Sequence, residues 1–380
     1  MVNPLTVLRE PESQPESRLP AQVQRLQRPQ PLGRAVELAF LRWEKRQLAP
    51  TERFWRDFGM HVVESGRERL LARGTGHAPA IAIVTRGRED RFIGPAFVMS
   101  NDTDLQVYIK TLNAKLLSPE QIPGGGRGVE LLDPAGRAVW LVQGQARAEP
   151  LANRSAVTPL CNSADHAPRV NRTVRTPIEP AKVIRLGHLV LQTVDFAGMT
   201  AWYLRVLGLI PTDVQYLADG SPNLAFCRLN LGDTPADHHT LVIVGAIEER
   251  YEHSAYEVID LDALGQGYQV LRAQGYRHVW GIGRHVLGSQ LFDYWRDPNG
   301  FELEHYTDGD LFTADAETTY SPFDMGSLWA WGDDLPASMK PAMNLRALLR
   351  IAKLLQAKRI TLRRLKLISA ALNAPARPWL

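Results

Sequence analysis

An internal repeat constrains this chain more than any other feature of its sequence. Residues 35–43 are typical of a strand, residues 51–59 of a helix with Thr51 as its N-cap, and three strand-like segments follow. The same order returns more loosely from residue 94, and again from residues 183 and 253; Asp195 and Gly208 are the expected N-cap and stop of the helix in the third round. Such self-similarity indicates one supersecondary unit used several times. We therefore predict an α+β fold of four βαβββ modules, paired two and two, with each pair forming a domain of curved sheets around a cavity.

This pairing also predicts the domain boundaries. Residues 1–32 carry six prolines and no periodic pattern, so we expect a flexible or loosely docked arm. One domain should span residues 33–148 and the other residues 183–312. The segment 149–182, rich in Ala, Pro, Asn and Arg, is typical of a linker.

The last segment, residues 313–380, is predicted to be an extension of the second domain. From residue 341 onward it has nine Lys or Arg and no Asp or Glu. Leucines at helical spacing among these cations predict a basic amphipathic helix over residues 344–372. That helix could pack on its own domain or on another subunit, lie on an acidic membrane surface, or bind an acidic protein. Residues 320–332 could either close the mouth of a pocket or simply pack on the domain.

Composition excludes several classes of protein. Apolar residues make up 44% of the chain, which is enough for a sizeable core, and the net charge of +3 does not favour a nucleic-acid binder. The two cysteines, Cys161 and Cys227, do not form a C-x-x-C pair, so a disulfide framework is not expected. No apolar run reaches the length of a membrane span, and the first residues lack the apolar core of a signal peptide. We expect a cytoplasmic homo-oligomer.

Three residues of the second half form a candidate metal site. His188 lies in the first predicted strand of the third module, His253 opens the first strand of the fourth, and Glu304 lies in the last strand. Two imidazoles and one carboxylate on neighbouring strands would make a facial triad, which leaves positions open on an octahedral metal. Each residue alone is more often a packed or surface residue. Their placement at matching positions of the repeat favours a metal site.

The first half lacks these ligands. Alignment of the repeats places Glu37 near the position of His188, Gly94 at that of His253, and Trp140 at that of Glu304. We therefore expect a structural first domain that binds no metal in this way, followed by a catalytic second domain.

Four segments carry a family resemblance. They are GHLVLQ around His188, DHHTLVIV around His239, HSAYEV around His253, and the segment from Arg284 to Glu304 that ends in DPNGFELE. In the last, Tyr294 follows His285 by nine residues and Glu304 follows Tyr294 by ten. Over roughly residues 35–310 the chain resembles the type I extradiol ring-cleavage dioxygenases of the vicinal oxygen chelate superfamily.

The resemblance implies a function and roles for these residues. His188, His253 and Glu304 would hold Fe(II), with Mn(II) as the other possible metal, and the enzyme would cleave a catechol-type diol with O2 in the degradation of aromatic compounds. His239 would be the acid and base beside the metal. Tyr294 would hydrogen-bond a substrate oxygen, and His285 would be a further donor.

Other interpretations stay open at this point. His238 should face away from His239, because adjacent strand residues point to opposite faces. Tyr294 could be a core aromatic, and His239 a surface histidine. The segment Val286-Leu287-Gly288 makes the pocket more apolar than in some relatives. The alternatives to a dioxygenase are another metal-dependent enzyme of the superfamily, such as a glyoxalase-type lyase or isomerase, and a non-enzymatic binding protein.

Overall fold

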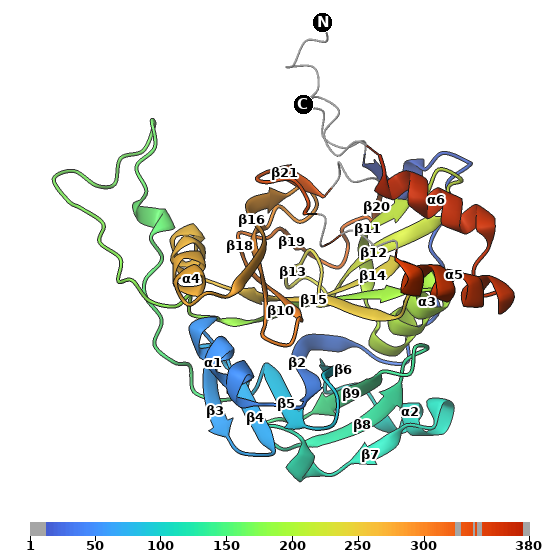
Figure 1. The fold of residues 1–380 in the computed structure, drawn as a ribbon, viewed down its shortest axis with the longest axis horizontal. Coiled ribbons are helices and arrows are strands. Elements are labelled where there is room, and N and C mark those ends of the chain that lie inside the picture. The colour runs from blue at the N-terminus through green and yellow to red at the C-terminus, as the bar shows by residue number, and fades with distance from the viewer. Residues whose placement is uncertain (1–12, 324–327, 337–338, 340–343, 375–380) are drawn as a thin grey trace, which may run out of the picture.

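The computed structural model describes residues 13–323, 328–336, 339 and 344–374. Within these residues it has an eight-stranded sheet in the first half of the chain and an eleven-stranded sheet in the second half. Figure 1 shows the two sheets as separate bodies, the first in blue to green and the second in green to orange. The structure is therefore a mixed α+β fold built of two β-rich domains.

The first sheet runs in the order β3-β4-β5-β2-β6-β9-β8-β7. Its strands are β2 (Ala35–Lys45), β3 (His61–Ser65), β4 (Arg69–Arg73), β5 (Ala82–Arg86), β6 (Arg91–Met99), β7 (Lys115–Leu117), β8 (Arg127–Leu132) and β9 (Ala138–Gln143).

The second sheet runs in the order β1-β20-β11-β12-β14-β10-β15-β18-β17-β16-β21. Its strands are β1 (Gln14–Pro15), β10 (Arg185–Thr193), β11 (Ile210–Tyr216), β12 (Pro222–Arg228), β14 (Leu241–Gly245), β15 (Arg250–Glu257), β16 (Arg277–His285), β17 (Leu291–Arg296), β18 (Glu302–Thr307), β20 (Thr319–Pro322) and β21 (Trp329–Trp331). A separate pair is formed by β13 (Ala236–Asp237) and β19 (Leu311–Phe312).

The strand pairing shows the predicted repeat directly. In the first sheet two four-stranded modules meet at the antiparallel pair β2–β6, and each central strand has a parallel partner on its other side, β5 or β9. In the second sheet the modules meet at β10–β15, with β14 and β18 as the parallel partners. The four βαβββ modules, paired two and two, are confirmed.

Each module contributes one helix, and the chain ends in two more. They are α1 (Ala49–Asp57), α2 (Leu105–Leu112), α3 (Phe196–Leu207), α4 (Leu261–Ala273), α5 (Leu345–Gln356) and α6 (Leu362–Leu372). The predicted limits of α3 are confirmed, because Asp195 caps it by accepting from the Gly198 amide and Gly208 ends it at a φ of 63°. Thr51 is not the N-cap of α1, since that helix begins at Ala49 with a proline in its first turn.

The described parts of both chain ends pack on the second domain. Residues 1–12 of the predicted arm lie outside the described residues, but residues 13–32 are docked on the second domain. Val23 and Leu26 are buried there, and the Leu26 amide donates to the Tyr320 hydroxyl at 3.0 Å. The predicted C-terminal helix is two helices, because Lys358 takes a φ of 54° and Thr361 caps a new helix. Their buried residues pack around Leu217 of the same domain, as Figure 1 shows in red.

The two domains share buried polar contacts. Lys45 at the end of β2 forms an ion pair with Asp297, and each side chain is only 2% exposed. His305 of β18 stacks on Phe58 with ring centroids 3.7 Å apart and bonds its carbonyl oxygen at 2.7 Å. These contacts fix the first domain against the strand that carries Glu304. Among the residues described, we find no helix with the length and apolar character needed to cross a membrane.

Candidate metal centre

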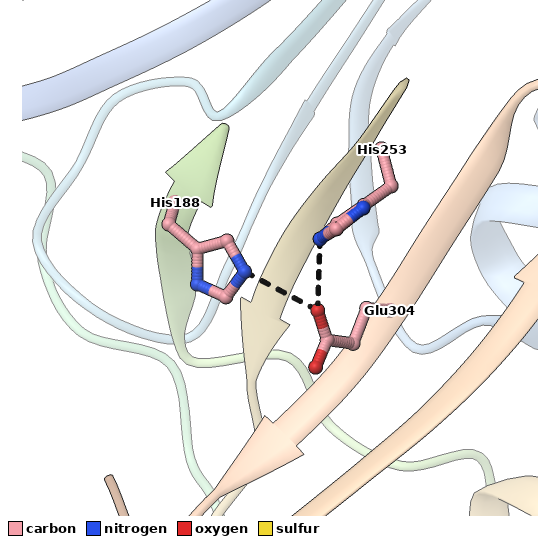
Figure 2. A group of neighbouring side chains, drawn as sticks. All are labelled: His188, His253 and Glu304. Carbon is pink, nitrogen blue, oxygen red and sulfur yellow. Dashed lines mark ion pairs between the residues drawn. The ribbon is translucent and has the colours of Figure 1, made fainter. Parts of the chain in front are cut away.

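Three neighbouring strands bring His188, His253 and Glu304 together. In the sheet His188 of β10 pairs with Ala255 of β15, and Ala255 pairs with Glu304 of β18. His253 precedes Ala255 by two residues and so projects from the same face. The Oε2 atom of Glu304 lies 3.2 Å from Nε2 of His188 and 3.3 Å from Nε2 of His253, as Figure 2 shows. The ligand atoms of all three lie within 4.8 Å of one another.

The environment of this cluster fits a cation. Glu304 is fully buried, and among the described residues neither of its carboxylate oxygens has a hydrogen-bond partner. Burial would raise the pKa of Glu304, but the imidazoles of His188, His253 and His285 outweigh it and hold this pKa well below its usual value. A buried carboxylate without hydrogen bonds costs several kcal/mol unless a positive charge compensates it. Two imidazoles and one carboxylate suit a metal that keeps open positions.

A second carboxylate orients His253. Nδ1 of His253 bonds Glu252, which can only accept, so Nδ1 carries the hydrogen and Nε2 faces Glu304. Burial opposes the charged imidazole, yet Glu252 and Glu304 together raise the pKa of His253 to about 10. Such a carboxylate–histidine pair is the usual support of a metal-binding imidazole. Sequence analysis missed Glu252, although its position directly before His253 was a usable signal.

His285 and Tyr294 lie beside Glu304 on the next two strands. Nδ1 of His285 donates to the Leu328 carbonyl at 2.7 Å, and its Nε2 is 3.1 Å from the Tyr294 hydroxyl and 3.7 Å from Oε1 of Glu304. Burial and the Glu304 charge raise the pKa of Tyr294 well above its usual value. Tyr294 therefore stays protonated and is a hydrogen-bond donor at neutral pH.

The Leu328 carbonyl belongs to the segment after the last strand of the repeat. Here β21 pairs with β16 at Arg284 and His285, and Trp329 packs on Trp280 with ring centroids 5.5 Å apart. Residues 324–327 of the predicted closing segment lie outside the described residues. The part that is described holds His285 in place and adds an aromatic cluster beside it.

His239 lies on the opposite side of the cluster, next to His188. It is 4% exposed, and its ring centroid is 4.2 Å from that of His188. Burial, together with the neighbouring histidines, holds the pKa of His239 well below its usual value. His239 is therefore a neutral imidazole at pH 7, and it is available as a proton acceptor within reach of the metal position.

His238 does not face away from His239. Residues 238–240 lie between β13 and β14 and are not strand, so the alternation of faces does not apply to them. His238 is 1% exposed, and its Nδ1 lies 2.8 Å from Nδ1 of His239. Its Nε2 lies 2.6 Å from Oδ2 of Asp213 in β11. No spacing in the sequence indicated Asp213.

The first sheet shows which residues stand at the equivalent positions. Glu37 was expected at the position of His188, and the register corrects this. Phe40 pairs with Ala96 directly after a bulge, just as His188 pairs with Ala255 directly after a bulge. The position of His188 is therefore taken by Phe40, three residues beyond Glu37.

Gly94 and Trp140 lie where the alignment placed them. Trp140 pairs with Ala96 in the register that Glu304 has in the second sheet, and Gly94 precedes Ala96 by two residues. The rings of Phe40 and Trp140 meet edge to face, with centroids 6.1 Å apart and an interplanar angle of 88°. An aromatic pair thus fills the position that holds the polar cluster in the second sheet.

Comparisons with known proteins agree with this geometry. A family model described as Glyoxalase/Bleomycin resistance protein/Dioxygenase superfamily matches residues 185–305. The chain is 31% identical over 215 residues to metapyrocatechase 2 of Cupriavidus necator, and the match covers 56% of this chain and 63% of that protein, less than two thirds of its length. It is 32% identical over 146 residues to biphenyl-2,3-diol 1,2-dioxygenase 3 of Rhodococcus globerulus, covering 36% of this chain and 69% of that protein.

Solved structures share the fold. A variant of homoprotocatechuate 2,3-dioxygenase from B. fuscum is similar with a TM-score of 0.68 at 18% identity, covering 85% of this chain and 87% of that chain. The two-domain arrangement of the sheets is therefore a known one.

Proposed function

Because the chain belongs to the extradiol dioxygenases of the Glyoxalase/Bleomycin resistance protein/Dioxygenase superfamily, we propose that it opens the ring of a catechol-type diol with O2. The metal is one Fe(II) ion held by His188, His253 and Glu304, and Mn(II) is the other metal that these donors suit. One observation carries the proposal: the ligand atoms of two imidazoles and one fully buried carboxylate lie within 4.8 Å of one another. The product is a ring-opened hydroxy-dienal or dienoic acid, formed in the degradation of aromatic compounds.

The roles of the surrounding residues follow from their protonation. Bound Fe(II) supplies the redox chemistry that lets triplet dioxygen react with a singlet ring. His239 is neutral and accepts a proton from a catechol hydroxyl, then returns it to the leaving oxygen, a general acid–base role worth about 10²–10⁴-fold in rate. Tyr294 remains protonated and donates a hydrogen bond to the deprotonated substrate oxygen. Before a diol binds, the Tyr294 hydroxyl donates to Nε2 of His285 at 3.1 Å, because Nδ1 of His285 donates to the Leu328 carbonyl. The hydroxyl turns to the substrate oxygen when the diol binds.

An oxygen-consumption assay tests the proposal. Protein loaded anaerobically with Fe(II) is given a panel of monocyclic, biaryl and steroid-derived catechols and hydroquinones, while oxygen uptake and a yellow ring-fission product are recorded. We expect at least one diol to be consumed with oxygen. If no diol consumes oxygen, the chain is not a ring-cleaving dioxygenase.

Two variants separate the metal ligands from the acid–base residue. His253→Ala removes a ligand and should abolish bound iron, measured by elemental analysis of the purified protein. His239→Asn keeps all three ligands, so it should retain iron and slow turnover. Equal loss of iron in both variants would contradict the division of roles.

We also propose that the protein works in the cytoplasm as a homo-oligomer. Cys161 and Cys227 are both free thiols, which is in keeping with a reducing compartment. The α5 helix presents Leu345, Leu348 and Leu349 to solvent, each more than half exposed, and such a surface is typical of a subunit contact. Sedimentation equilibrium of the full chain tests the oligomer.

A further inference from the structure

A buried chain of hydrogen bonds leads from the candidate metal centre to β11 of the second sheet. It runs from His239 through the two Nδ1 atoms, 2.8 Å apart, to His238, and from Nε2 of His238 to Asp213 at 2.6 Å. All three residues are at most 6% exposed. Asp213 ends the chain on β11, where it accepts a hydrogen bond from Thr319 of β20.

The chemistry of the partners decides where the hydrogens lie. An ionised carboxylate only accepts, so the Asp213 contact requires a hydrogen on Nε2 of His238. When His238 is neutral, its Nδ1 is then an acceptor, and the hydrogen between the two rings belongs to Nδ1 of His239. A neutral His239 with its hydrogen on Nδ1 has a lone pair on Nε2. That nitrogen is the one left for a substrate.

We propose that Asp213 and His238 are positioning residues that set the tautomer of His239, so that Nε2 meets the substrate as a proton acceptor. The inference deepens the proposed function and rests on it for the role of His239 in turnover. Neither residue touches the three metal-binding side chains. Their effect reaches the reaction only through the hydrogen on Nδ1 of His239.

The residues around His238 hold its ring in one orientation. The Thr212 hydroxyl donates to the His238 carbonyl at 2.7 Å, and the His238 amide donates to the Asp310 carbonyl at 2.9 Å. On the other side the backbone of Gly288 approaches the His238 ring so closely that an added Cβ would lie 3.1 Å from Nδ1. The ring therefore has little room to turn, and the direction of its two hydrogen bonds is fixed by the fold.

Nitrogen NMR reads the tautomer without any turnover. The full chain is labelled with ¹⁵N-histidine and loaded with Zn(II) as a diamagnetic metal, and His239 is assigned by comparison with His239→Asn. We expect hydrogen on Nδ1 in the wild-type protein. In Asp213→Asn, Thr319 keeps the oxygen of the amide, the amide nitrogen donates to His238, and the hydrogen of His239 moves to Nε2.

Two NMR results overturn the inference. One is a wild-type His239 with its hydrogen on Nε2. The other is an Asp213→Asn protein in which the tautomer does not change. Because this readout needs no diol, it stays valid if the proposed function itself fails in the oxygen assay, so the two failures are distinguishable.

Kinetics then tests whether the tautomer matters. His238→Leu removes the acceptor for the Nδ1 hydrogen of His239 and should lower kcat by about 10²-fold, with little change in KM, the lower end of an acid–base contribution. His238→Asn places an amide oxygen near the lost Nδ1 and should recover most of kcat. Equal kcat in the two variants, or a wild-type kcat in Asp213→Asn, refutes the inference.

A matched control comes from another histidine–aspartate pair of the same domain. His278 lies 2.8 Å from Asp293 and does not touch the cluster of metal-binding side chains. His278→Asn should leave kcat unchanged after correction for the folded fraction. A loss of kcat in His278→Asn as large as in His238→Leu would mean that the loss of a histidine–aspartate pair lowers kcat through stability, and the inference would fall.

Discussion

Metal binding should release one proton per ion at pH 7. Three pKa shifts of the metal-free protein predict this number. His188 has a lowered pKa because burial disfavours its charged form, so it is neutral and has no proton to lose. Glu304 is ionised, since three imidazoles outweigh its burial. His253 is protonated, because Glu252 and Glu304 overcome burial and raise its pKa to about 10.

The sign and size of the pH dependence follow from that proton. The metal replaces the proton on Nε2 of His253, so raising the pH removes a competitor and strengthens binding. One proton corresponds to a tenfold change in affinity per pH unit, about 1.4 kcal/mol. Between pH 6.5 and 8.5, below the pKa of about 10, the Kd for Mn(II) should therefore fall about 100-fold.

Two measurements check the count independently. A pH-stat titration of the metal-free protein with Mn(II) gives the protons released per ion, and chelator competition at several pH values gives the slope of log Kd. Glu252→Gln should lower the pKa of His253 and flatten the slope. Glu248→Gln makes the same change in net charge at a residue paired with Arg350, so it should leave the slope at one. A release of no protons, or of two, from the wild-type protein refutes the reasoning.

Three further predictions concern single residues. Lys45→Met leaves Asp297 in the domain interface without its cation, so it should lower the free energy of unfolding by about 3–5 kcal/mol in urea melts. The double variant Lys45→Met/Asp297→Asn should recover part of this loss. Trp140→Ala removes one ring of the aromatic pair in the first domain, costing about 3–5 kcal/mol, and should not change the iron content measured by elemental analysis. Tyr294→Phe should keep its iron and lower kcat about tenfold, the value of one hydrogen bond, in steady-state assays.

The repeat made the fold and the metal cluster predictable. Strands at corresponding positions of paired modules lie side by side, so the repeat predicts that residues as far apart in sequence as His188 and Glu304 lie together. The helix limits followed where a cap marks them, as Asp195 and Gly208 do for α3. The prediction of Thr51 as the N-cap of α1 was wrong, because the helix begins two residues earlier, at Ala49, with a proline in its first turn.

Features that depend on local distortion or on distant partners could not be predicted. Counting along the repeats placed Glu37 near the position of His188, but Phe40, three residues further on, has the register of His188. Strand alternation predicted that His238 faces away from His239, but residue 238 is not part of a strand. Asp213 reaches it from another strand of the same module, 25 residues away in sequence, and nothing in the local sequence indicates that contact.

The aromatic pair of the first domain has a consequence for how the protein is made. Phe40 and Trp140 complete an apolar core at the point where the second domain depends on ionisable side chains. The first domain leaves the ribosome first, and domains generally fold as units. It can therefore fold before a metal binds. Phe58 and Lys45 are then in place to contact His305 and Asp297 when the second domain folds. Metal supply would then limit how much enzyme is active, while folding of the first domain would not depend on it.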